Sequence, residues 1–122
     1  MNKTTISKMI GLTFDNVLDS SDTLTFYQNG KVRFKFYHEQ DCCENVRIED
    51  ICGDLTDLIG TPLLVAAEIS GKAPEMKHDE SFTWTFYKFS TVKGHVTVRW
   101  LGESNGYYGE GVDLFDSMKE PD

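Results

Sequence analysis

The sequence has few cysteines, no long apolar run and a shortage of basic residues. Its three cysteines are an odd number, and Cys42 and Cys43 are adjacent, which is not the framework of a disulfide-stabilised secreted domain. No apolar stretch approaches the ~18 residues of a membrane-spanning helix. Residues 1–8 also lack the pattern of a secretory signal. We therefore expect a protein of a reducing compartment that has no membrane partner.

The shortage of positive charge limits the class of partner. Twelve Lys and Arg residues oppose 20 Asp and Glu residues, for a net charge of −8. A domain of this sign is repelled by bulk nucleic acid and by anionic membranes, so bulk nucleic acid is not an expected partner. The same charge also favours solubility without any specific function.

The length and composition of the chain suit one folded domain. The chain has 122 residues, of which 39% are hydrophobic and 12% aromatic, enough for one core. The polar ends predict a flexible N-terminus at residues 1–8 and a flexible acidic tail at residues 116–122. Between them, residues 9–115 are expected to form a single β-rich domain.

Alternating apolar and polar residues predict strands along most of this domain. Residues 23–28 and 31–38 alternate on either side of Asn29-Gly30, a pair typical of two-residue hairpin turns. Clear strands are also predicted at residues 63–69, 82–89, 95–101 and 111–115, and residues 9–18 and 46–48 are weaker candidates for a further one. Sequential hairpins favour an antiparallel sheet.

The pattern changes between residues 49 and 59. There Ile51, Leu55 and Leu58 recur at helical spacing, which predicts a short helix capped by Asp50 or Asp54. The expected fold class is therefore mainly β (α+β). It is a curved antiparallel sheet or half-barrel of six to seven strands, with one short helix closing one side.

The register of the late hairpin decides which of its side chains face solvent. A three-residue loop at residues 92–94 separates apolar from polar side chains better than a two-residue loop at residues 93–94, so the longer loop is expected. This register places Trp84 in the core and leaves Tyr87 and Arg99 on the polar face.

No constellation of residues predicts catalysis. His38 with Cys42, Cys43 and Cys52 offers zinc-ligand types, but the adjacent cysteines lack the two intervening residues that let a pair wrap a metal. Acidic neighbours on both sides of the pair also disfavour a reactive thiolate. We expect half-buried thiols, no metal, no cofactor and no enzyme activity.

Two surfaces suit ligand binding. The polar face of the late hairpin carries hydroxyls, one ring and one guanidinium, which can stack a base and grip a phosphate, or can simply be a solvated sheet face. The glycine-rich segment at residues 102–109 adds Tyr107 and Tyr108, whose rings offer stacking area. That segment also reads as an ordinary hairpin loop that needs no ligand.

Four stretches of the sequence carry a family resemblance. They are residues 38–44 (HEQDCCE), 48–55 (IEDICGDL), 83–88 (TWTFYK) and 99–108 (RWLGESNGYY). In these stretches the chain resembles a family of small phage and prophage proteins, and the resemblance extends from about residue 10 to residue 115. Because small accessory proteins of phages mainly counter host defence, the resemblance implies the cytoplasm of an infected host as the location.

One anti-defence strategy, taken here as an analogy, is an oligomeric β-rich protein that binds a cyclic nucleotide signal without cleaving it. We therefore expect a phage accessory protein that sequesters such a cyclic di- or trinucleotide. Exposed sheet edges and surplus aromatic surface predict a homo-oligomer, either a dimer or a tetramer. The expected ligand-binding residues are Tyr87, Arg99, Asn105, Tyr107 and Tyr108, with Trp84 and Lys88 as alternates if the late hairpin has another register.

An alternative function uses the acidic surface. Six carboxylates lie within residues 41–57, namely Asp41, Glu44, Glu49, Asp50, Asp54 and Asp57. A cluster of this kind can cover a basic surface on a protein. On this hypothesis the chain is a protein-directed inhibitor of a host defence or nucleic-acid enzyme.

Overall fold

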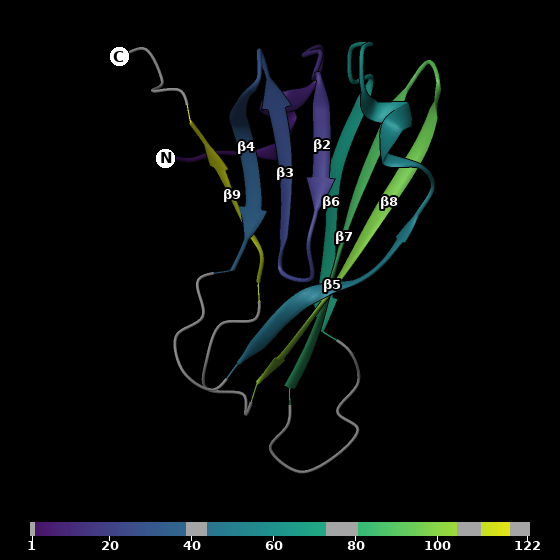
Figure 1. Ribbon diagram of the computed structural model, residues 1–122. Coiled ribbons are helices and arrows are strands. Elements are labelled where there is room, and N and C mark those ends of the chain that lie inside the picture. Colours follow the sequence, from purple (N-terminus) through teal and green to yellow (C-terminus); the bar gives the residue numbers. More distant parts are fainter. Residues whose placement is uncertain (1, 39–43, 73–80, 105–110, 118–122) are drawn as a thin grey trace.

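The computed structural model describes residues 2–38, 44–72, 81–104 and 111–117, which form two antiparallel sheets (Figure 1). The five-stranded sheet has the order β1 (Asn2–Lys3), β9 (Asp113–Asp116), β4 (Lys31–Tyr37), β3 (Thr23–Gln28) and β2 (Asn16–Asp19). The four-stranded sheet has the order β5 (Asn45–Cys52), β8 (Gly94–Ser104), β7 (Ser81–Thr91) and β6 (Val65–Lys72). Two 3-10 turns, η1 (Ile6–Met9) and η2 (Leu55–Leu58), complete the described elements.

The core lies between the inner faces of the two sheets. Phe26 on β3 and Phe36 on β4 are fully buried, and they meet the aromatic residues of β7. The ring centroids of Phe26 and Phe89 are 5.2 Å apart, and those of Phe36 and Tyr87 are 4.6 Å apart. Aromatic rings bury a large apolar area in such contacts, so this cluster decides which faces of the sheets turn inward.

The early hairpin is confirmed as predicted. Asn29 has φ 56° and Gly30 has φ 74°, and Gln28 pairs with Lys31. Two residues in the left-handed region give the turn the twist that neighbouring strands require. Phe34 and Phe36 point into the core, as their alternation predicts.

The mainly β, antiparallel fold class is confirmed, but the strands form two open sheets in place of one, and the predicted helix is wrong. Residues 49–52 continue β5, which pairs with β8. A bulge between Ile48 and Asp50 shifts the alternation of the strand, so Ile48 and Ile51 both lie beside core residues of β8. A bulge inserts one residue into a strand, and it here produces an apolar spacing of three that imitates a helix.

The helical spacing ends in a single 3-10 turn at η2. Gly53, with φ 109°, leads the chain out of β5, and Asp54 caps the turn by accepting a hydrogen bond from the Thr56 amide at 3.0 Å. The Thr56 hydroxyl and amide together hold the pKa of Asp54 below its ordinary value. The predicted cap at Asp54 is therefore confirmed, although the element it caps is shorter than expected.

The domain extends beyond the predicted bounds of residues 9 and 115. Lys3 pairs with Phe115 in the five-stranded sheet, and η1 follows directly. Asp116 is fully buried, with its carboxylate 2.9 Å from Arg33 Nε and 3.0 Å from Lys8 Nζ. Residues 2–8 and 116 therefore belong to the fold. No helix in the described ranges is long and apolar enough to cross a membrane.

Candidate functional site

The β7–β8 hairpin has a register that neither predicted loop gives. Thr91 pairs with Gly94, so the loop is Val92-Lys93, and none of these residues has a positive φ. The predicted three-residue loop with Thr91 opposite His95 is therefore wrong by one residue. Because a one-residue slip turns every side chain of a strand to the other face, the two faces of β7 are exchanged.

The exchange removes Tyr87 from the predicted binding face. Its ring is only 1% exposed and lies in the core against Phe36 and Phe89. The strand carries apolar residues on both faces, and contact with the aromatic rings of the opposite sheet selects the Tyr87 and Phe89 face as the inner one. Tyr87 is thus a core residue, and its predicted place beside Arg99 is wrong.

The same exchange brings Trp84, Lys88 and Arg99 together on the outer face, the side of the four-stranded sheet that points away from the five-stranded sheet. Phe86 pairs with Arg99 across β7 and β8, and Lys88 pairs with Thr97. The rings of Trp84 and Phe86 are stacked, with centroids 6.3 Å apart at an interplanar angle of 22°. The two alternates, Trp84 and Lys88, therefore share a face with Arg99, because the observed register differs by one residue from the expected one.

Arg99 is held in place by two neighbours. Its guanidinium lies 4.9 Å from the centre of the Trp84 ring, a cation–π contact. Its Nε donates to Asp50 Oδ1 at 3.1 Å, and its Nη2 donates to Asp50 Oδ2. The two side chains are 39% and 41% exposed, so solvent reaches the pair and weakens its attraction. Arg99 is therefore an oriented cation that remains accessible.

Apolar side chains continue the outer face across β6. Ile69 pairs with Phe86 and is 51% exposed, and Val65, near the other end of the strand, is 45% exposed. Ile69 thus extends the apolar surface of Phe86, and apolar surface exposed beside other apolar side chains marks interaction sites more often than isolated apolar residues do. The apolar residues on both faces of β7 were the signal in the sequence that pointed to this surface.

The remaining predicted ligand-binding residues, Asn105, Tyr107 and Tyr108, lie outside the described residues. They follow Ser104, the last residue of β8. Their predicted role therefore stays a prediction.

The histidine–cysteine segment is described only in part. His38 Nδ1 donates to the Gly111 carbonyl oxygen at 2.7 Å, and its Nε2 lies 3.0 Å from Glu44 Oε1. Cys52 is a free, exposed thiol, whereas Cys42 and Cys43 lie outside the described residues. Within the described ranges, no three His, Cys, Asp or Glu side chains gather closely enough to hold a metal ion. His38 is thus engaged in a structural contact between separate segments.

The acidic segment of the alternative hypothesis is only partly paired with cations. Four of its carboxylates have partners within the fold: Glu44 contacts His38, Glu49 contacts Arg47, Asp50 contacts Arg99, and Asp54 caps η2. Arg47 and Arg99 partly offset the charges of Glu49 and Asp50, whereas the exposed Asp54 bonds only to neutral groups of Thr56 and stays anionic. Asp41 lies outside the described residues, and the inhibitor hypothesis stays a prediction.

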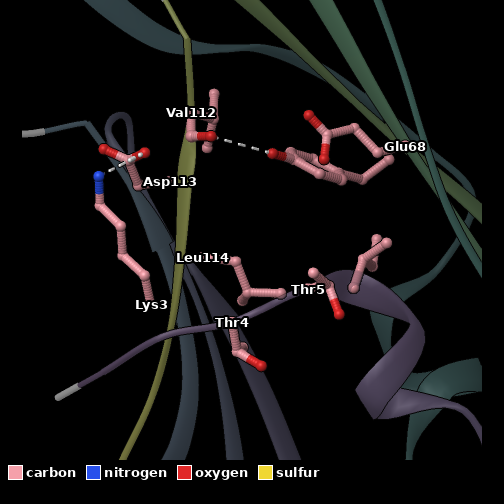
Figure 2. Close-up of a pocket in the computed structure, with 9 residues that line it drawn as sticks. Lys3, Thr4, Thr5, Glu68, Val112, Asp113 and Leu114 are labelled. Carbon is pink, nitrogen blue, oxygen red and sulfur yellow. Dashed lines mark hydrogen bonds and ion pairs between the residues drawn. The ribbon is translucent and has the colours of Figure 1, made fainter.

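A cavity of about 220 Å³ lies elsewhere, between residues 3–6, β9 and the edge of the four-stranded sheet (Figure 2). It contains the carboxylate of Glu68 and is bordered by the Tyr87 hydroxyl, which donates to the Val112 carbonyl oxygen at 3.5 Å. The sequence hypotheses missed it because it joins three segments that are far apart in the chain. A carboxylate at an inward position of β6 was the available signal.

The chain belongs to the family described as "Domain of unknown function (DUF7448)", whose model matches residues 3–114. No curated protein and no solved structure matches the chain. The family description assigns no activity, so the function has to be inferred from the surfaces described above.

Proposed function

We propose that this domain is a binding module that takes a small nucleotide on the outer face of its four-stranded sheet. Within this proposal it is a phage accessory protein that sequesters a cyclic nucleotide signal in the host cytoplasm without cleaving it. The observation that carries the binding proposal is the stacked, half-buried Trp84–Phe86 pair, flanked by Arg99 and Lys88. The host setting rests on the resemblance of residues 10–115 to small phage proteins.

The outer face offers the contacts that a nucleotide needs. A base that stacks on an aromatic side chain gains about 1–3 kcal/mol, whatever its identity. Lys88 is exposed and makes no ion pair within the described part of the chain, so its ammonium is available to a phosphate. Arg99 uses Nε and Nη2 for Asp50, which leaves Nη1 for a further acceptor. The face therefore combines stacking area with two cations.

A second copy of the chain would cover the ligand from its other side. A ligand on one sheet face is covered from one side only, and Val65 and Ile69 leave apolar area exposed beside the proposed site. A two-fold dimer through this face would place the same residues on both sides of the ligand. A cyclic dinucleotide with two identical halves matches such symmetry, so we propose a dimer or tetramer with its ligand sites at the interface.

The test uses the different burial of the two tryptophans. Trp100 is fully buried, whereas Trp84 is half-buried on the outer face. A panel of cyclic di- and trinucleotides and ADP-ribose derivatives is first screened by thermal shift, because a ligand that binds only the folded state raises its Tm. For each hit, the ligand should quench the emission of the wild type, and Trp84→Phe should abolish this quenching.

The affinities of variants for each hit then test whether the ligand binds on this face. Lys88→Ala should weaken binding about tenfold, the scale of one charge-assisted contact, whereas Lys31→Ala, on an exposed position of β4, should not. The recovered nucleotide should be chemically unchanged. A panel without any thermal shift would remove the proposal. So would a hit that Lys88→Ala and Trp84→Leu both bind with the affinity of the wild type.

A further inference from the structure

The cavity beside Glu68 forms where the edges of the two sheets are bridged by the N-terminal segment. Lys3 pairs with Phe115 on β9, and η1 packs against β6, so residues 3–6 cross from one sheet to the other. The space beneath this crossing measures about 220 Å³. At about 30 Å³ for each water of the liquid, it has room for about seven waters or for an organic molecule of similar volume.

Glu68 holds an unusual position in this cavity. On β6 it shares the inward side with Ala66, and it pairs with the buried Tyr87 of β7. Because β6 is an edge strand, the Glu68 side chain is exposed beside this buried ring and is only partly desolvated. Glu68 makes no hydrogen bond or ion pair with any other residue that the structure describes. It remains exposed at the rim, so a ligand in solvent can reach it.

The charged groups around Glu68 do not neutralise it. Desolvation raises the pKa of Glu68, and the like charge of Asp113 raises it further. Lys3 is the cation nearest in the lining, but its Nζ pairs with Asp113 at 3.5 Å. Figure 2 shows Lys3 and Asp113 on one side of β9 and Glu68 on the other. Burial raises the pKa of Tyr87 well above its ordinary value, so its hydroxyl stays neutral and donates to the Val112 carbonyl.

The residues that line the rest of the cavity favour an organic cation over a metal ion. Ile6, Val112 and Leu114 supply apolar surface, and Leu114 extends toward the cavity in Figure 2. A metal ion such as Ca²⁺ requires six to eight oxygen ligands, whereas here one carboxylate without a partner faces a partly apolar space. An alkylammonium ion, with one charged end and an apolar body, matches both features.

We propose that this cavity binds a small organic ammonium ion, with its nitrogen against the Glu68 carboxylate and its apolar part among Ile6, Val112 and Leu114. This site is separate from the outer face of the four-stranded sheet, and it takes a ligand of the opposite charge to a nucleotide. The ammonium ion supplies the counter-charge that the described residues do not.

The probe is pentylamine, with pentanol as its neutral counterpart of similar shape. Titration into the ¹⁵N-labelled protein at pH 7, followed by heteronuclear NMR, should show saturable shifts of the Glu68, Tyr87 and Val112 amides with pentylamine. Pentanol should bind at least tenfold more weakly, because it lacks the charge. Pentylamine binding should also weaken as the pH falls through the raised pKa of Glu68, since protonation removes the anion.

Two variants with the same change of net charge locate the anchor. Glu68→Gln keeps the shape of the side chain and should weaken pentylamine binding at least tenfold. Glu103→Gln, on the outer face, should leave the affinity unchanged. Equal binding of pentylamine by Glu68→Gln and the wild type would overturn the proposal. So would equal binding of pentanol and pentylamine, or the absence of saturable shifts at about 10 mM pentylamine, a concentration that fills even a millimolar site.

Discussion

Arg33 on β4 donates from Nε to the carboxylate of Asp116 on β9 at 2.9 Å, inside the fold. Asp116 is fully buried, and the Arg33 side chain is only 12% exposed. The ion pair joins two residues 83 positions apart, and Lys8 of η1 adds a second cation to the same carboxylate. One buried anion therefore holds the two ends of the chain and a central strand together.

Replacement of Asp116 by Asn should strongly destabilise the domain. The change removes the anion and leaves two largely buried cations without their counter-charge, which typically costs about 3–5 kcal/mol. Urea denaturation of the wild type and of Asp116→Asn measures the difference. Asp19→Asn, at an exposed position of β2, is the matched control and should change stability by less than about 0.5 kcal/mol. Equal losses in the two variants would show that the buried cluster does not stabilise the fold.

Gly53→Ala should be destabilising, and Gly71→Ala should not. Gly53 has φ 109°, and a Cβ at this residue would overlap the carbonyl oxygen of His95. Backbone strain alone costs about 1–3 kcal/mol at such a position, and the overlap adds to it. At Gly71 the φ is ordinary and no atom lies within 4 Å of the place that a Cβ would take, so Ala should stabilise β6 by about 0.5 kcal/mol. Thermal melts of both variants check the opposite signs.

Arg99→Ala separates a structural from a binding role for this residue. Its ion pair with Asp50 is well exposed on both sides, so the free energy of unfolding should fall by less than about 1 kcal/mol. For the nucleotide found by thermal shift, however, the affinity should fall by about 1.5–3 kcal/mol, the scale of a charge-assisted bond. Lys31→Ala serves as the folded control for binding. If Arg99→Ala and the wild type bind with the same affinity, the site lies elsewhere.

Glu68→Gln should change how stability depends on pH. The pKa of Glu68 is raised in the folded state above its ordinary value of 4.5. The folded state therefore holds this proton more tightly than the unfolded state does. The contribution of the protonated group is fully present below pH 4.5 and is lost as the pH rises through the raised pKa. Compared with the wild type, Glu68→Gln should have a similar Tm near pH 4 and a higher Tm at pH 7. A lower Tm of the variant at pH 7 would indicate that Glu68 has a stabilising partner.

The sequence by itself determined the parts of the structure that depend on local backbone chemistry. Asn29 and Gly30 accept a positive φ, and the strands on either side alternate, so the turn of the β3–β4 hairpin was predictable. The register shift between Phe26 and Tyr27, beyond which Phe26 pairs with Phe34, was not. Asp54 was one of two candidate caps, with Asp50, and it caps η2 because its short carboxylate reaches an amide two residues along the chain. The mainly β, antiparallel class followed from the same alternation.

Only the tertiary structure decided the register of the β7–β8 hairpin, and with it the composition of the candidate site. Both faces of β7 carry aromatic residues, so alternation alone does not identify the inner one. The choice depends on Phe26 and Phe36 of the opposite sheet, which receive Phe89 and Tyr87. Trp84 is left on the outer face, where its ring contacts the Arg99 guanidinium. The tertiary structure alone also decided the Glu68 cavity and the Arg33–Asp116 ion pair. Both join segments that are far apart in the sequence, so they depend on how the elements pack, and local patterning does not encode that packing.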